Sequence, residues 1–333
     1  MNKVAFWLKN ARSIALPQSV LPAALAIAVA AKHEGFSLWL ALLALVGIIA
    51  AHLAMNLADD YFDFQTKTGE HRQEMASEGI RARIAKYDYL TSGKATIGQL
   101  RTAIVLFLLV AAVLGAVVFV FRGMPVVYIA LATLFLGIEY SGKPLQLGYH
   151  GWGEWVIGII FGPLLMAGMH IAASGVFTQE VLLTSIAVGL LVINIVYSHA
   201  VLDEPADEKC GKMTFSRLLK SKPAKLAFSY IFNLLPFVIV LGGVLAGILH
   251  WAYCFVLLVL PMAIYLVYSL TSFVYGREIS LQPKKWMGPM GNWDGYCKAG
   301  IGWFMIRWLV CRNLVTFFSF ILIVVNVILA FVI

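Results

Sequence analysis

The stretch that decides the fold is residues 38–64, which read LWLALLALVGIIAAHLAMNLADDYFDF. It begins as an almost uninterrupted apolar run and ends in three carboxylates, Asp59, Asp60 and Asp63. About 20 apolar residues in a row are what an α-helix needs to cross the roughly 30 Å of hydrocarbon in a bilayer. The stretch therefore predicts a membrane-spanning helix that ends in a group of acidic side chains.

The rest of the chain repeats this apolar pattern. Of the 333 residues, 61% are hydrophobic and only 13% are charged, and the mean hydropathy is +0.86, whereas a soluble domain carries about 25% charged residues. Hydropathy predicts nine spans, at 14–32, 38–60, 99–121, 125–141, 153–173, 180–202, 226–248, 251–275 and 312–333. We expect an all-α polytopic membrane protein with a single integral-membrane domain, 1–333, forming a nine-transmembrane-helix bundle around a central cavity with cytoplasmic loop caps.

The distribution of basic residues predicts the orientation of the bundle. Of the 25 Lys and Arg residues, all but Lys32 and Arg122 lie in the N-terminal segment and the four longer connections, or just inside the adjoining span ends. By the positive-inside rule these segments face the cytoplasm, so the N-terminus is cytoplasmic and the C-terminus lies on the outer side. The net charge of +8 therefore reflects topology and contact with membrane lipids, and it does not indicate a nucleic-acid partner.

A second acidic group, Asp203 and Asp207, follows the sixth span. On a helix that turns about 100° per residue, Asn56, Asp60 and Asp63 lie within about 60° of one another. Asp203 and Asp207 are likewise four residues apart and share a face. An even number of spans separates the two groups, so both emerge on the same side of the membrane and are predicted to face each other across one cavity.

Carboxylates stacked in this way repel one another unless a cation offsets their charge. Oxygen ligands on two facing helices suit Mg²⁺, which takes one or two carboxylates and shares its other positions with waters and phosphate oxygens. We therefore predict a Mg²⁺ site, with the ligands Asn56, Asp60, Asp63, Asp203 and Asp207. The plain alternative is that these acids are solvated helix ends. Two acidic groups on the same side favour the functional interpretation.

Basic residues near the two groups are predicted to bind phosphate. These are Arg83, Lys86, Lys94 and Lys212. An anionic leaving group bridged by Mg²⁺ needs such partners to stabilise its developing charge. Each of them also has a simpler interpretation, as a residue that sets topology.

The two motifs, NxxxDxxD ending the second span and DxxxDxxxGK ending the sixth, resemble those of the UbiA superfamily of intramembrane aromatic prenyltransferases. The resemblance covers essentially the whole chain. Three stretches are similar to the 1,4-dihydroxy-2-naphthoate prenyltransferase branch: ARSIALPQSVLPAALAIAVA, LTSGKATIGQL and YSGKPLQLGYHGWGEWVIGIIFGPLLMAG.

The resemblance implies nine transmembrane helices, with Mg²⁺ and a polyprenyl diphosphate held by the two motifs. It assigns catalytic roles to Asp60, Asp63, Asp203, Asp207, Lys143 and Tyr140, the last two in YSGKP, where the family has polar residues near the reaction centre. The chain departs from the family at His199–Leu202, HAVL, where Asn-Asn-x-Arg is common. Either another cation replaces that arginine, or the second motif binds differently.

Polar residues within the sixth span are candidates for contact with substrate. Asn194 and His199 are the two that we include in the predicted site, and interhelical hydrogen bonding is the alternative for each. The long connection 276–311 carries Trp, Lys and Arg residues, which indicates an interfacial segment or a lid, with a bilayer anchor as the simpler interpretation.

The function that these features predict is Mg²⁺-dependent transfer of a polyprenyl group to an aromatic quinone precursor, with 1,4-dihydroxy-2-naphthoate of menaquinone biosynthesis as the expected acceptor. We expect the protein in the plasma (inner) membrane of a bacterium. Another aromatic acceptor is the alternative within this class. A cation-coupled transporter fits less well, because transporter sites lie near the membrane midplane, and a lipid-binding structural protein leaves the aspartates unexplained.

Overall fold

The computed structural model describes residues 2–65, 87–209 and 211–332. In these ranges nine helical segments are long and apolar enough to cross a membrane, and no strand is present. The predicted all-α bundle is therefore confirmed. The nine spans are η1–α2 (Ser13–Ala30), α3 (Leu38–Gln65), α6 (Ile97–Arg122), α7 (Met124–Ser141), α8–η3–α9 (Gly153–Ser174), α10 (Gln179–Leu202), α13 (Lys222–Leu245), η4–α14 (Trp251–Val274) and α16 (Gly302–Val332).

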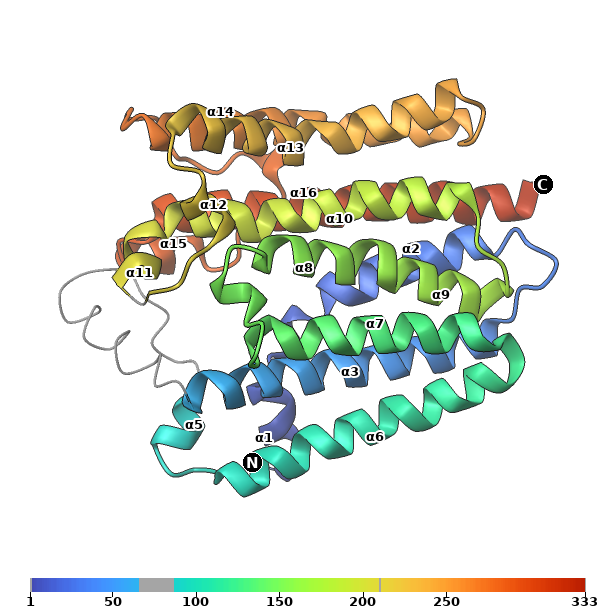
Figure 1. Ribbon diagram of the computed structural model, residues 1–333. Helices are drawn as coiled ribbons and strands as arrows, with labels where there is room; N and C mark the ends of the chain where they lie inside the picture. The colour runs from blue at the N-terminus through green and yellow to red at the C-terminus, as the bar shows by residue number, and fades with distance from the viewer. Residues whose placement is uncertain (1, 66–86, 210, 333) are drawn as a thin grey trace.

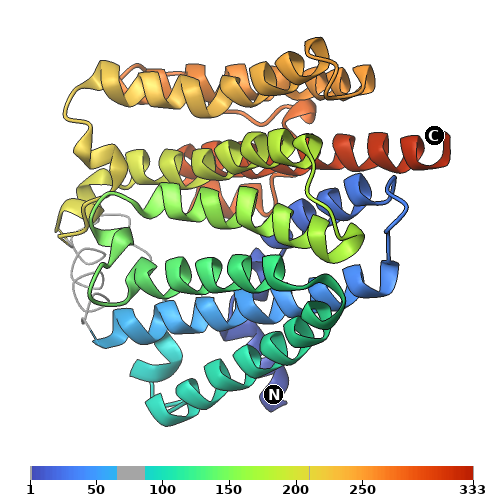
Figure 2. The same ribbon diagram turned by 45° about the vertical axis from the view of Figure 1, so that its right-hand side comes forward.

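The long helices lie side by side, and short helices gather at one end of the bundle (Figure 1). The short helices at this end are α5 (Asp88–Thr91), α11 (Glu204–Lys209) and α15 (Trp293–Lys298). Because α3 and α10 both finish here, with the two acidic motifs, we call it the motif end. The turned view in Figure 2 shows the same arrangement, with the C-terminus at the opposite end.

Glycine residues allow the fifth span to approach α10 closely. The span is interrupted by η3 (Ile160–Leu164), a π-helical turn that contains Pro163. A Cβ atom on Gly162 would lie 2.5 Å from the Cα atom of Gly189 and 2.6 Å from the carbonyl oxygen of Ser185. Small residues at such positions let membrane helices pack backbone to backbone, and here they fix the position of α10, which leads into the second acidic motif.

The last helix begins at Gly302, well before the predicted start near residue 312. Arg307 does not interrupt it, because its guanidinium is satisfied by backbone carbonyls. Its Nε and Nη2 atoms donate to the Ser269 oxygen at 3.2 and 3.0 Å, and Nη1 donates to Trp303 at 2.6 Å. The predicted connection 276–311 is therefore shorter than expected, since residues 302–311 belong to α16.

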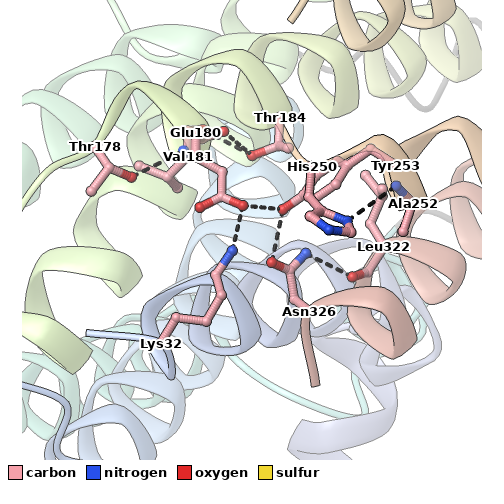
Figure 3. A network of polar contacts seen from close by, with 10 residues as sticks. All are labelled: Lys32, Thr178, Glu180, Val181, Thr184, His250, Ala252, Tyr253, Leu322 and Asn326. Atoms are coloured by element: carbon pink, nitrogen blue, oxygen red, sulfur yellow. Dashed lines mark hydrogen bonds and ion pairs between the residues drawn. The ribbon is translucent and has the colours of Figure 1, made fainter. Parts of the chain in front are cut away.

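Lys32 and Arg122, the two basic residues at the end opposite the motifs, both have partners within the protein. Arg122 donates to the carbonyls of Ala172 and Ala173 at 2.9 and 2.8 Å. Lys32 pairs with Glu180 in the polar network of Figure 3.

Tyr253 is the centre of that network. Its hydroxyl lies 2.6 Å from Glu180 Oε1 and 2.8 Å from Asn326 Oδ1 (Figure 3). Because Tyr253 and Asn326 are fully buried, the network ties α10, η4 (Trp251–Val259) and α16 together with Lys32, just beyond α2.

Glu180→Gln is predicted to destabilise the bundle, because it leaves Lys32 without its counterion and weakens the contact with Tyr253. We expect a loss of about 1–3 kcal/mol, the cost of leaving a buried polar partner unsatisfied, measured as a lower thermal midpoint in detergent. Glu34→Gln, on an exposed side chain of the same end, is the matched control. Equal midpoints for the two variants would contradict the role given to the network.

Candidate active site

The first acidic motif lies on the last turns of α3. Asp60 and Asp63 are each only 3% exposed. Tyr89 donates its hydroxyl to Asp60 Oδ2 at 3.2 Å, and Tyr149 donates to Asp63 Oδ1 at 2.7 Å. Carboxylates buried to this extent require such donors or a nearby cation.

That cation is Arg12, which precedes the first span. Its Nη2 atom lies 3.2 Å from Asp59 Oδ2 and 3.2 Å from Asp60 Oδ1, and it also donates to the Asn56 carbonyl. Burial alone would lower the pKa of Arg12, but the negative charges of Asp59 and Asp60 outweigh it and the pKa is raised. The guanidinium therefore stays charged beside the motif.

Sequence reasoning overlooked Arg12. The signal that would have identified it is its position, as a single basic residue immediately before the first span and on the same side of the bundle as the acidic motif. Its backbone is left-handed, with φ of 58°, and the Asn56 amide donates to the Ala11 carbonyl at 2.9 Å. These contacts fix the N-terminal segment to α3, and they engage the amide nitrogen of the predicted ligand Asn56.

Tyr89 connects α5 to the same motif. Burial raises the pKa of its phenol, and the negative charge of Asp60 and the hydrogen bond to it raise the pKa further. Tyr89 therefore remains a neutral donor. The rings of Phe6 and Trp7 from α1 (Lys3–Asn10) meet Tyr89 edge to face at 6.1 and 5.9 Å, so α1 covers this side of the motif.

The second acidic motif lies where α10 ends. Asp203 is the C-terminal cap of α10, and its Oδ2 atom lies 3.4 Å from His199 Nε2. Asp207, on α11, is 8% exposed, and its carbonyl accepts the backbone N–H of Lys212 at 2.9 Å. Arg217 donates to the Lys212 carbonyl at 2.6 Å, which holds the turn after the motif.

One loop connects the two motifs, the segment 142–152 between α7 and α8 (Gly153–Ile159). On one side, Ser141, the last residue of α7, donates to Asp59 at 2.6 Å, and Tyr149 of the loop donates to Asp63. On the other side, the Tyr149 carbonyl accepts the Met213 N–H at 3.2 Å. A hydrogen-bonded path therefore runs from the first motif to the chain that follows the second.

Glu154 strengthens the second half of this path. It is 2% exposed, and its two carboxylate oxygens lie 3.0 and 3.2 Å from the backbone nitrogen of Phe215. Through this contact the start of α8 holds α12 (Phe215–Leu218), just beyond the second motif. Glu154 is therefore a positioning residue.

The structure gives different environments to the other predicted residues. Lys143 and Lys94 are exposed, and Lys94 Nζ lies 3.8 Å from Asp88 Oδ2. Tyr140 is partly buried, and glycines at 148 and 153 leave room for its ring. Arg83 and Lys86 lie outside the described residues.

Asn194 forms interhelical hydrogen bonds, which was the alternative to contact with substrate. It is fully buried, and it exchanges two hydrogen bonds of 2.9 Å with Asn233 of α13. His199, by contrast, has 44% of its side chain exposed and lies edge to face with Phe304 at 5.1 Å. We therefore leave Asn194 out of the candidate site and keep His199.

The donor set of the motifs fits a hard divalent cation. The available ligands are mainly carboxylate oxygens, which Mg²⁺ prefers. Among the described side chains, no group of three or more His, Cys, Asp or Glu residues is arranged to hold a metal ion by itself. Mg²⁺ is commonly bound by one or two carboxylates together with phosphate oxygens of a substrate and not by an all-protein cage, so the arrangement suits an ion shared with a diphosphate.

Comparison with known proteins identifies what the chain is similar to. The model of the UbiA prenyltransferase family matches residues 19–280. The 1,4-dihydroxy-2-naphthoate octaprenyltransferase of Mycobacterium tuberculosis is 24% identical over 286 residues, covering 84% of this chain and 90% of that protein. The protein of the same name from Bacillus subtilis is 27% identical over 232 residues, covering 70% and 71%.

Solved structures share the fold. A digeranylgeranylglyceryl phosphate synthase aligns with a TM-score of 0.65 at 17% identity, covering 98% of this chain and 99% of that one. A UbiA homologue from Archaeoglobus fulgidus bound to GPP and Mg²⁺ aligns with a TM-score of 0.59 at 14% identity, covering 96% and 99%. At these identities the likeness establishes the bundle architecture.

Arg12→Gln is predicted to destabilise the protein by about 3 kcal/mol, because it leaves two largely buried carboxylates without their cation. Thermal unfolding in detergent measures the loss, with Lys9→Gln on exposed α1 as the control for charge. Millimolar Mg²⁺ is expected to stabilise the Arg12 variant more than the wild type, because the ion replaces the lost charge. A midpoint equal to that of the Lys9 variant would contradict the assignment.

Proposed function

Because the chain belongs to the UbiA prenyltransferase family and is therefore a membrane prenyltransferase, we propose that it transfers a polyprenyl group from polyprenyl diphosphate to 1,4-dihydroxy-2-naphthoate, a step of menaquinone biosynthesis. The observation that carries the proposal is that two acidic motifs lie at one end of the bundle. There Tyr149 of the loop 142–152 donates to Asp63 and accepts the N–H of Met213, directly after the second motif. The acceptor is supported by the names of the relatives. Membership of this family decides against the transporter and the structural protein.

We place the diphosphate at the motif end and the isoprenoid tail among the apolar spans. Asp60, Asp63, Asp203 and Asp207 would hold Mg²⁺, with Asn56 as a further oxygen ligand. When bound, the ion neutralises diphosphate charge and makes it a better leaving group.

The chain's own cations complete this charge stabilisation. Arg12 already lies against the first motif. We propose that it replaces the arginine that the second motif lacks. Lys212 ends the second motif, and Lys94, Arg83 and Lys86 are the further basic residues that we propose for phosphate contact. Cationic donors of this kind stabilise charge that develops on a leaving group.

The reaction then proceeds at the allylic carbon. Its C–O bond breaks with the electron pair going to the diphosphate, and an electron-rich ring carbon of the acceptor supplies the pair for the new C–C bond. We propose that Tyr140, Lys143 and His199 orient the acceptor. Tyr140 and Lys143 flank Ser141, which donates to Asp59, and His199 lies beside Asp203. The apolar spans keep water from the allylic cation.

Orientation in the membrane follows from the same site. In the sequence, all Lys and Arg residues but Lys32 and Arg122 lie in the N-terminal segment and the longer connections or just inside the adjoining span ends. We assign the motif end to the cytoplasmic side of a bacterial inner membrane. The N-terminus is then cytoplasmic and the C-terminus, at the opposite end (Figure 2), lies on the outer side.

Purified protein in detergent, given labelled polyprenyl diphosphate, Mg²⁺ and 1,4-dihydroxy-2-naphthoate, is expected to form prenylated naphthoate. Asp60→Asn and Asp203→Asn should each lower the rate at least about a hundredfold, the scale expected when an electrostatic contact to the transition state is lost. Asp294→Asn, on an exposed side chain of α15, is the control.

Either aspartate variant retaining wild-type activity would refute the site. Product with a different aromatic ring but none with dihydroxynaphthoate would refute the acceptor while leaving the prenyltransferase intact. Circular dichroism and thermal midpoints of the variants confirm that lost activity does not come from unfolding.

A further inference from the structure

The segment between α14 (Leu260–Val274) and α15 turns back along the bundle before it reaches α15 (Figures 1 and 2). Its turning point is η5 (Lys285–Met287). Met287 is fully buried, and Asn313 of α16 donates its amide to the carbonyls of Met287 and Pro289 at 2.8 and 3.0 Å. The turn is therefore fixed against α16.

Gly288 makes this docking possible. Its φ is +80°, which favours glycine, and a Cβ atom there would lie 2.7 Å from the Phe317 ring and 2.9 Å from the Asn313 amide nitrogen. On the α14 side, the rings of Trp286 and Tyr265 meet edge to face at 5.8 Å. The segment is thus held on both sides by specific contacts.

The length of the helices places this turn at the membrane surface. From Asn313 to the end of α16 at Val332 the helix rises about 29 Å at about 1.5 Å per residue, close to the thickness of the hydrocarbon core. From the start of α3 at Leu38 to Asp60 the rise is about 33 Å by the same measure. Asn313 and the first acidic motif are therefore each separated from the far end of their own helix by about one hydrocarbon thickness.

Cations cluster at this turn without acidic partners. Lys284 and Lys285 are exposed side chains at its start. Arg312, beside Asn313, donates to the Pro289 carbonyl at 3.2 Å and lies 5.8 Å from the centre of the Trp308 ring. Within the described part of the chain, none of these three cations forms an ion pair with a carboxylate.

We propose that this turn, Lys284–Met287 with Arg312, binds the phosphate headgroup of an anionic membrane phospholipid. The charge is complementary, and the depth is that of the headgroups. Trp286 and Tyr268 are 43% and 56% exposed, and such aromatic side chains prefer this level of the bilayer. Basic groups between membrane helices on the cytoplasmic side are a recurrent solution for anionic headgroups. The substrate diphosphate is a less suitable occupant, because the turn offers no carboxylates to share its metal.

The test compares the thermal stability of full-length protein in nanodiscs of phosphatidylcholine with and without phosphatidylglycerol of the same acyl chains. A ligand that binds only the folded state raises the melting temperature. We expect phosphatidylglycerol to raise it for the wild type, and Lys284→Gln/Lys285→Gln to lose at least half of that rise. The control is Lys3→Gln/Lys220→Gln, which removes the same charge from exposed lysines elsewhere at the motif end and should keep the rise.

Equal losses in the two double variants would overturn the proposal, because they would mean diffuse attraction to the anionic surface. The proposal would also be overturned if phosphatidylcholine nanodiscs stabilised the wild type as much as nanodiscs that contain phosphatidylglycerol. The proposal would also be overturned if a prenyl diphosphate abolished the stabilisation by phosphatidylglycerol, because the turn would then be part of the substrate site. If the double variant melts early in phosphatidylcholine, Lys285→Gln alone replaces it. The readout involves no turnover, so it is independent of the proposed reaction.

Discussion

Burial of the carboxylates of Asp60 and Asp63, with partial burial of Asp59, at the end of α3 carries a desolvation cost that charge and hydrogen bonds must offset. The partners are Arg12 of the N-terminal segment, Tyr89 of α5, Ser141 at the end of α7 and Tyr149 of the loop that follows α7. Because each partner must reach the same helix end, this requirement assembles the motif end. It draws the N-terminal segment, α5 and the loop between α7 and α8 around the first motif.

The loop 142–152 then extends the arrangement to the second motif. The Tyr149 hydroxyl donates to Asp63, and the Tyr149 carbonyl accepts the N–H of Met213. The Glu154 carboxylate accepts the backbone N–H of Phe215. The two motifs are thus held by the same element and not only by the packing of distant helices. A diphosphate between them would be bound on a support that is already in place, which favours precise positioning of the reacting bond.

The sequence predicted the nine spans and the shared end of the two motifs, because hydropathy and helix periodicity are local signals, and the resemblance of the two motifs to those of a known family predicted the family. It did not predict Arg12, whose role depends on a contact across 47 residues with Asp59. The start of α16 was also misplaced, because Arg307 was interpreted as lying outside the helix, whereas the Ser269 and Trp303 carbonyls satisfy it. Asn194 was an equivocal candidate for the same reason, since its partner Asn233 lies on another helix.

A structure of the protein with Mg²⁺ and a non-ionisable thio-analogue of polyprenyl diphosphate tests the central claim most directly. The account predicts that the diphosphate lies between the two motifs, with metal bound through Asp60 or Asp63 on one side and Asp203 or Asp207 on the other. A diphosphate bound away from both motifs, or metal held by one motif alone, would contradict it.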